Sequence, residues 1–216
     1  MWTWSLNWGE ITPSIVIGSC PMTAADLECI VAANRITALL SLQHDDCLAY
    51  WDIDYPGMVA TARRMNVIMA RCPIRDFDIA DMRKRLPEAV SMLAGLIGSE
   101  RRTYVHCTAG MGRAPLTVLG YLIWVAGYNR EEAIRLILQE RPEAVPAWEA
   151  FDDAETDLEK CYRREIKALA YKLHEAGVNA DPGADWHQAK TRILREKLAT
   201  GDPGFIGLQN ATRSGH

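Results

Sequence analysis

A histidine, a cysteine, two glycines and an arginine stand at fixed spacing in one segment of the chain. The segment reads His106-Cys107-Thr108-Ala109-Gly110-Met111-Gly112-Arg113 and lies between two apolar stretches. These residue types could hydrolyse phosphate esters through a phosphocysteine, because a thiolate attacks phosphorus and an arginine holds phosphate oxygens with a planar pair of donors. We therefore predict Cys107 as the nucleophile and Arg113 as the phosphate clamp.

The residues between them are predicted to form the phosphate cradle. A strand that ends at His106 would present Cys107 at the mouth of a tight loop, which opens directly onto a helix N-terminus. Backbone N–H groups converge at such a turn and favour a bound phosphate and a thiolate. Gly110 and Gly112 are expected to let the chain turn with its N–H groups inward. The predicted phosphate-binding residues are Thr108, Ala109, Gly110, Met111, Gly112 and Arg113.

A carboxyl group on another loop should protonate the leaving oxygen. Asp76 lies 31 residues before Cys107, which leaves room for one helix and one returning strand. We predict Asp76 as this acid and Asp78 as the alternate, although Asp78 also suits the cap of the following helix. For His106, the sequence leaves open a buried core histidine or a residue that orients the loop.

Positioning these loops requires a sheet with helices around it. Short apolar runs alternate with helical patterns, which predicts an α/β fold. Strands are expected over 14–17, 38–42, 67–70 and 103–106, and helices over 24–33, 57–65, 86–97, 115–126, 130–141, 148–176 and 186–198. Thr23 with Asp26, and Asn129 with Glu132, form predicted capping boxes, and Pro87 is expected in a first helical turn. Gly127 is predicted to end a helix.

Composition narrows the functional classes. The 216 residues carry a net charge of −4, which argues against a nucleic-acid partner. The six cysteines form no C-x-x-C pair, so we expect no metal site, no cofactor and a reducing compartment. No signal peptide or membrane-spanning run is recognised, which predicts an intracellular, soluble protein. The sequence leaves homo-oligomerisation open.

The H-C-x-x-G-x-x-R pattern at 106–113 is the signature of protein tyrosine phosphatases, and its spacing to Asp76 resembles that of the small dual-specificity branch. More closely, residues 6–162 resemble the plant starch-excess-type glucan phosphatases, kin to laforin. The matching segments are Ile11-Thr12-Pro13 through Val16-Ile17-Gly18-Ser19, Ser41-Leu42-Gln43-His44-Asp45, Arg75-Asp76-Phe77-Asp78, and Tyr104 through Pro115.

This resemblance implies a central, mostly parallel sheet flanked by helices, and removal of phosphate from starch-like or glycogen-like glucans. It implies Asp76, Cys107 and Arg113 as the catalytic residues. It also implies an aromatic channel for glucan chains, built from Trp8, Tyr50, Trp51 and Phe77. The sequence alone keeps Phe77 open between the core and the wall of the substrate site.

Two positions depart from the wider family. Ala114 replaces the hydroxyl residue that usually follows the arginine, as in the plant glucan branch. Ser41 stands where some relatives carry a cysteine able to pair with the nucleophile, so that redox switch is not expected here.

The predicted organisation is a phosphatase domain over 1–162 and a helical C-terminal extension over 163–216, packed on it, with about the last fifteen residues disordered. Because the extension is not all-β, glucan affinity is expected to come from the phosphatase surface alone.

The alternative function is a dual-specificity protein phosphatase acting on phosphotyrosine or phosphoserine, and a third is a non-enzymatic glucan-binding protein. The expected compartment is the cytoplasm, or the plastid stroma if a transit peptide has been removed.

Overall fold

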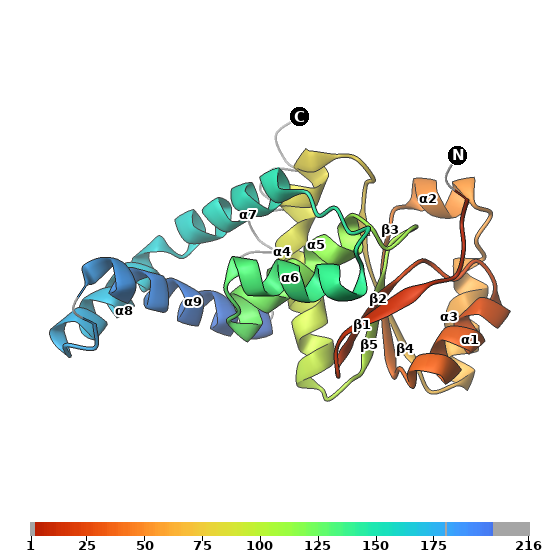
Figure 1. The fold of residues 1–216 in the computed structure, drawn as a ribbon, viewed down its shortest axis with the longest axis horizontal. Coiled ribbons are helices and arrows are strands. Elements are labelled where there is room, and N and C mark those ends of the chain that lie inside the picture. Colours follow the sequence, from red (N-terminus) through yellow and green to blue (C-terminus); the bar gives the residue numbers. More distant parts are fainter. Residues whose placement is uncertain (1–2, 180, 201–216) are drawn as a thin grey trace.

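A five-stranded sheet forms the centre of the molecule (Figure 1). The computed structural model describes residues 3–179 and 181–200, so the predicted disordered tail lies outside the described residues. The strands are β1 (Trp8–Thr12), β2 (Ile15–Gly18), β3 (Ala38–Gln43), β4 (Ile68–Ile74) and β5 (Thr103–His106). Their spatial order is β1-β2-β5-β3-β4, with β1 antiparallel to β2 and the other neighbours parallel. The predicted α/β class with a mostly parallel sheet is confirmed.

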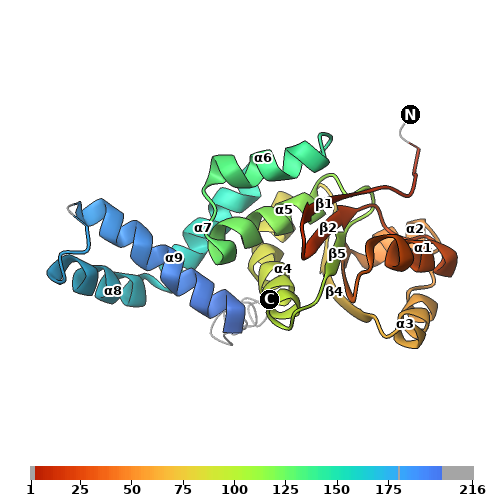
Figure 2. The same ribbon diagram turned by 60° about the horizontal axis from the view of Figure 1, so that its bottom comes forward.

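Helices cover both faces of the sheet, and the strands alternate between two cores. Helices α1 (Ala24–Asn34) and α3 (Tyr55–Arg64) lie on one face, and α4 (Ile79–Gly98) and α5 (Arg113–Gly120) lie on the other (Figure 2). Within β5, Tyr104 packs on the α1 side and Val105 on the α4 side. Successive side chains of a strand point to opposite faces, and both faces of this sheet are buried. The strands are therefore nearly continuous apolar runs in the sequence.

The predicted capping signals are confirmed. At α1, the Thr23 side chain accepts from the Asp26 N–H group while Asp26 accepts from the Thr23 N–H group. Asn129 and Glu132 form the same reciprocal pair at the start of α6 (Arg130–Glu140). Gly127 ends the preceding helix with a φ angle of 86°, in the left-handed region that glycine adopts readily.

Several elements differ from the sequence prediction. Strand β1 and the short helix α2 (Asp45–Tyr50) were not predicted. Helix α4 begins at Ile79, so Pro87 lies inside it, and its predicted place in a first turn is wrong. Proline removes one intrahelical hydrogen bond, but Met82, Leu86 and Val90 bury one face of α4 and keep the helix continuous. The helix expected over 115–126 ends in a π-helical turn, η1 (Tyr121–Ala126).

The C-terminal extension shares the core of the rest of the molecule. It follows α7 (Trp148–Cys161) and consists of α8 (Arg163–Glu175) and α9 (Pro182–Thr200). Leu194 and Leu198 of α9 join the apolar cluster on the α4 side of the sheet. Arg195 Nε donates to the Val125 carbonyl at 2.6 Å, and Ser91 Oγ donates to the Leu198 carbonyl at 2.8 Å. The division into two domains at residue 162 therefore stays a prediction.

Among the described residues, none of the helices combines the length and apolar character needed to cross a bilayer.

This shared core predicts that α9 unfolds together with the sheet. Leu194 is 1% exposed, and Leu194→Ala should lower the free energy of unfolding by about 2–5 kcal/mol, the usual cost of a core cavity. Urea unfolding followed by circular dichroism should remain a single transition. The control, Arg192→Ala on the exposed side of α9, should change stability little. If Leu194→Ala instead produced a separate transition at lower urea and left the main transition unchanged, the extension would fold independently of the sheet.

Candidate active site

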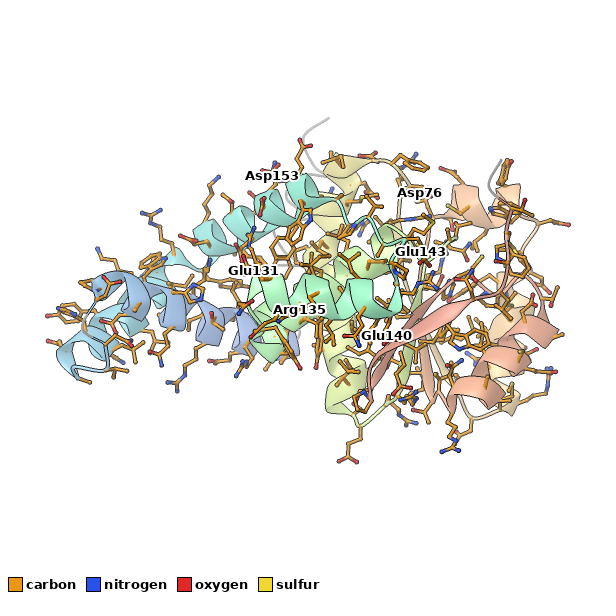
Figure 3. The ribbon with its side chains drawn as sticks, in the orientation of Figure 1. Asp76, Glu131, Arg135, Glu140, Glu143 and Asp153 are labelled. Carbon is orange, nitrogen blue, oxygen red and sulfur yellow. The ribbon has the colours of Figure 1, made fainter. Side chains whose placement is uncertain are left out.

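The loops predicted to carry the chemistry meet at one edge of the sheet. Cys107 follows β5, Asp76 follows β4, and α2 follows β3, so all three come after the carboxyl ends of parallel strands, where such sheets form their sites. Figure 3 shows Asp76 at this edge, on the loop that leads into α4. A cavity of about 1100 Å³ opens there, and Cys107, Asp76 and Trp51 are among the residues that line it.

The carbonyl groups of the 107–112 loop are held from outside the loop. The Cys107 carbonyl accepts from the His106 ring at 3.0 Å, and the Thr108 carbonyl accepts from the Cys20 N–H group at 3.1 Å. Arg141 Nη2 donates to the Ala109 carbonyl at 3.2 Å. The Val145 N–H group donates to the Met111 carbonyl at 2.7 Å. Four peptide groups of the loop, those that begin with the carbonyls of residues 107, 108, 109 and 111, thus have a fixed orientation.

This orientation turns the following N–H groups toward the inside of the loop. In a trans peptide, the N–H group of one residue points opposite to the carbonyl of the residue before it. The N–H groups of Thr108, Ala109, Gly110 and Gly112 therefore face away from the outer partners, and none of them donates to another of the residues that the structure describes. Unpaired donors that converge at a helix N-terminus form an anion cradle.

The two glycines of the loop differ in what they contribute. Gly110 has a φ angle of +74°, and a Cβ atom added there would lie 2.5 Å from the Gly18 carbonyl oxygen. Gly112 has a φ angle of −110°, and an added Cβ atom would meet no protein atom within 4 Å. The expectation that both glycines are needed for the turn therefore holds for Gly110 and is wrong for Gly112, because the loop bends into the left-handed region at only one of them.

Arg113 is buried, and both of its terminal nitrogens already donate hydrogen bonds. Nη1 donates to the Ile74 carbonyl at 2.9 Å, and Nη2 donates to Asp76 Oδ2 at 2.7 Å and to Thr108 Oγ1 at 3.2 Å. Nε is buried and has no partner among the described residues. An oxyanion in the loop would satisfy this orphan donor. Burial opposes the charge on Arg113, but the nearby Cys107 and Asp76 outweigh burial and raise its pKa.

The two candidate carboxylates have different surroundings. Asp76 forms the ion pair with Arg113 and lines the cavity, with its side chain 37% exposed. Asp78 also borders the cavity, but its Oδ1 accepts from the Asp81 N–H group at 2.9 Å and caps α4. The geometry thus favours Asp76 as the acid and leaves Asp78 the capping role that the sequence also suggested. The assignment of Asp76 stays a prediction.

His106 is a buried neutral histidine that holds the loop. Burial lowers its pKa to about 4, helped by the charge of Arg113 and opposed by its hydrogen bond to Cys107. Because the Cys107 carbonyl only accepts, Nδ1 carries the proton, and Nε2 is left without a partner among the described residues. Both readings of His106 therefore apply, since it belongs to the interior and also fixes one carbonyl of the loop.

Three of the four predicted glucan-contact aromatics line the cavity. Phe77 is 93% exposed and has a φ angle of +57°, which is a strained conformation for an aromatic residue. Tyr50 is 79% exposed and contacts Trp51 edge to face, with ring centroids 5.2 Å apart. Trp51 is partly buried against the core on the α1 side. Trp8 does not line the cavity, because it lies on β1 and packs against that same core.

Sequence reasoning missed two residues near the loop. Arg141 was read only as a helix end, yet it is 3% exposed and bridges the Ala109 carbonyl to Asn7 Oδ1, which lies 2.6 Å from Nη1. Cys47, on the unpredicted α2, lines the cavity and accepts from Arg113 Nη1 at 3.4 Å. Neither position lies in a motif, and the sequence pattern at Arg141 indicates only the end of a helix.

Comparison with known proteins agrees with this geometry. Residues 20–152 match the family described as "Dual specificity phosphatase, catalytic domain". The chain belongs to this family. The match includes the cysteine loop and Asp76, so the resemblance predicted from the 106–113 signature is confirmed at the family level.

Among curated proteins, this dual-specificity phosphatase is 36% identical over 209 residues to phosphoglucan phosphatase DSP4, amyloplastic, of Castanea sativa, covering 91% of this chain and 55% of that protein. It is 32% identical over 153 residues to phosphoglucan phosphatase LSF1, chloroplastic, of Arabidopsis thaliana, covering 68% of this chain and 25% of that protein. Laforin of Mus musculus is 27% identical over 171 residues, covering 71% and 49%. The chain spans about half the length, or less, of these relatives.

Solved structures share the fold of this dual-specificity phosphatase. The structure of PTPMT1 aligns with a TM-score of 0.55 at 20% identity and covers 76% of this chain and 99% of that one. Kinase associated phosphatase aligns with a TM-score of 0.56 at 17% identity, covering 72% and 94%. At these identities the likeness supports the sheet and its flanking helices.

The loop geometry predicts unequal effects of two small substitutions. Gly110→Ala should lower kcat/KM about 100-fold, because the left-handed backbone and the contact with the Gly18 carbonyl would displace the N–H groups. Gly95→Ala, at an exposed glycine of α4 where an added Cβ atom would meet no protein atom within 4 Å, is the control and should change it only about twofold. Steady-state hydrolysis of an aryl phosphate measures both. If Gly110→Ala lost no more activity than the control, the placement of the inward N–H groups would not depend on the left-handed conformation at Gly110.

The buried His106 predicts a pH dependence of stability. Its folded-state pKa of about 4 lies below the ordinary value of 6.5, so the unfolded chain binds more protons between these pH values. This contribution to stability is complete above pH 6.5 and is lost as the pH falls toward 4. Between pH 7.5 and pH 5, wild type should lose on the order of 2 kcal/mol more unfolding free energy than His106→Gln.

Urea titrations at the two pH values measure this difference. His187→Gln, a change at an exposed histidine of α9, is the control and should keep the wild-type dependence. A His106→Gln curve parallel to that of wild type would mean that His106 is not held neutral by the fold.

Proposed function

We propose that this protein hydrolyses phosphate monoesters of starch-like or glycogen-like glucans through a phosphocysteine intermediate. The observation that carries the proposal is the exposed aromatic rim of the Cys107 cavity, where the side chains of Phe77 and Tyr50 are largely exposed to solvent. Sugar rings stack their C–H faces on such side chains. Large exposed apolar groups beside a cavity mark a binding surface, since a protein otherwise buries them.

The first chemical step transfers the phosphoryl group to the enzyme. Cys107 Sγ forms a bond to phosphorus while the bond from phosphorus to the sugar oxygen breaks, and Asp76 gives its proton to that oxygen. The inward N–H groups and Arg113 bind the three outer oxygens. The phosphate competes for Arg113 Nη2, which the Asp76 carboxylate occupies in the free protein, so substrate binding releases Asp76. Asp76 then takes up a proton from solvent, and this is the proton that it gives to the leaving oxygen.

The second step regenerates the thiolate. A water molecule attacks phosphorus, Asp76 accepts a proton from it, and the bond between sulfur and phosphorus breaks. Ala114 is fully buried and has no hydroxyl group to assist the departing sulfur. Stabilisation of the thiolate therefore falls to the N–H groups of the loop and to Arg113.

Relatives support the choice of substrate. Two curated proteins similar to this chain are named phosphoglucan phosphatases, and their names place one in the amyloplast and one in the chloroplast. We propose a plastid location and a phosphorylated glucan as substrate on this basis. The uncharged residues Thr108, Ala109 and Met111 agree with a sugar chain of low charge density, because a polyanionic headgroup would favour lysines at these positions.

The decisive experiment compares three substrates on one preparation. Wild type should release phosphate from solubilised phosphoglucan faster than from a phosphotyrosine or phosphoserine peptide. Phe77→Ala and Tyr50→Ala should each lower release from phosphoglucan about 5- to 150-fold, by analogy with stacking on bases, and leave aryl phosphate hydrolysis nearly unchanged. Both side chains are exposed, so the melting temperature should not move. Trp51→Ala suits this test less well because Trp51 also packs in the core.

Tyr128→Ala is the matched control, since Tyr128 is 40% exposed and does not line the cavity. Preference for the phosphopeptides, with no effect of the rim substitutions on phosphoglucan, would contradict the glucan assignment and make the protein-phosphatase function the better one. Absence of aryl phosphate hydrolysis by wild type would identify a binding protein without activity.

A further inference from the structure

A second cavity lies between α8 and the start of α9, in the part of the molecule that the mechanism does not use. Its volume is about 420 Å³. In both ribbon views the α8–α9 pair extends away from the sheet and from the cysteine loop (Figures 1 and 2). A ligand bound there would not reach Cys107 unless it were a long polymer.

One face of α8 supplies most of this second cavity. Arg163, Lys167, Tyr171 and His174 follow at intervals of four, four and three residues, which places them along a single side of the helix. Tyr171 is 62% exposed. Arg163 and Lys167 are exposed, and neither has an ion pair or hydrogen bond from its side chain to the residues that the structure describes. Their charges therefore face solvent at the cavity.

The α9 side supplies a second aromatic and a carboxylate that is already paired. Trp186 is partly buried and lines the cavity opposite α8. Asp185 is 1% exposed, and it accepts from Asn179 Nδ2 at 2.8 Å and lies 3.3 Å from His174 Nδ1. Asp185 is thus buried and turned toward partners within the fold, so the charged side chains that this cavity presents to solvent are Arg163 and Lys167.

Two free cations beside two aromatic side chains suit a ligand that carries both rings and a negatively charged group. We propose that this cavity is a second binding site for phosphorylated glucan, with Tyr171 and Trp186 against the sugar rings and Arg163 and Lys167 on a phosphate group. The proposal rests on the proposed function. A nucleic acid would also combine rings and phosphates, but the chain has a net charge of −4 and this site offers only two free cations.

The expected benefit is one of tethering. A phosphoglucan chain held on α8 and α9 keeps other phosphorylated units of the same polymer near Cys107, which raises their effective concentration without new contacts at the active site. A small ester gains nothing from such a tether. Loss of the second site should therefore raise KM for the polymer and leave the hydrolysis of an aryl phosphate unchanged.

Binding can be measured without turnover in the full chain carrying Cys107→Ser. The probes are solubilised phosphorylated amylopectin and the same batch after enzymatic removal of phosphate, in native gels with increasing glucan. In that background, Arg163→Met with Lys167→Met, and separately Tyr171→Ala, should weaken binding of the phosphorylated polymer at least about fivefold. Arg164→Met with Lys172→Met, two exposed cations of α8 outside the cavity, is the matched control and should bind as the parent does.

The active protein provides the second measurement. With Cys107 intact, the Arg163 and Lys167 double variant should raise KM for phosphorylated amylopectin at least about fivefold, while kcat/KM for an aryl phosphate stays at the wild-type value. Equal behaviour of the two double variants would overturn the proposal. Equal affinity of the parent for the phosphorylated and the dephosphorylated polymer would also overturn it. So would an Arg163 and Lys167 double variant that lost affinity for an RNA oligonucleotide but kept its affinity for phosphorylated amylopectin. If wild type bound phosphoglucan through these residues but released no phosphate, the proposed function would fail while this site stood.

Discussion

The outward anchoring of the loop carbonyls is the constraint on which the rest of the structure depends. Bare N–H groups repel one another and prefer solvent or hydrogen-bond partners, so a loop that points four of them inward needs a fixed reason to do so. Here the reason lies in the partners of the opposite ends of the same peptide groups, namely the His106 ring, the Cys20 backbone, Arg141 and the Val145 backbone. These partners come from three parts of the chain, namely the end of β5, the segment after β2 and the segment after α6. The fold therefore acts on the chemistry by setting the direction of four dipoles.

A second balance involves the charge buried next to this loop. Arg113 is 1% exposed, and an isolated buried cation would be costly. Asp76 and the Ile74 carbonyl compensate it while the cradle holds no anion. In the proposed mechanism, phosphate binds the same guanidinium and displaces Asp76. In that mechanism Arg113 would link the stability of the free protein to the recognition of phosphate and to the availability of the acid.

How much of this the sequence could predict depended on how local each signal was. The Thr23 and Asn129 caps and the strand of 103–106 are written in a few adjacent residues, and the structure confirms them. Strand β1 carries a mixed polar pattern because it lies at the sheet edge, and α2 is only six residues long, so neither gave a periodic signal. Arg141 acts across 32 residues of chain on Ala109, and Trp8 packs through β1, so their surroundings depend on tertiary contacts that no local pattern records.

The position of the exposed aromatics bears on why a cysteine phosphatase would act on a polymer. A catalytic loop of this kind recognises only a phosphate and the atom that carries it, so selectivity has to come from surfaces beyond the loop. The rim at Tyr50 and Phe77 is adjacent to Cys107, whereas the cavity at Tyr171 and Trp186 is carried by helices that extend away from the sheet. In the proposed function, contacts at the rim would act on the unit being hydrolysed, and contacts on the extension would act on the chain to which that unit belongs. Two such surfaces would favour repeated reaction along one polymer, because dissociation from either would leave the other to retain it.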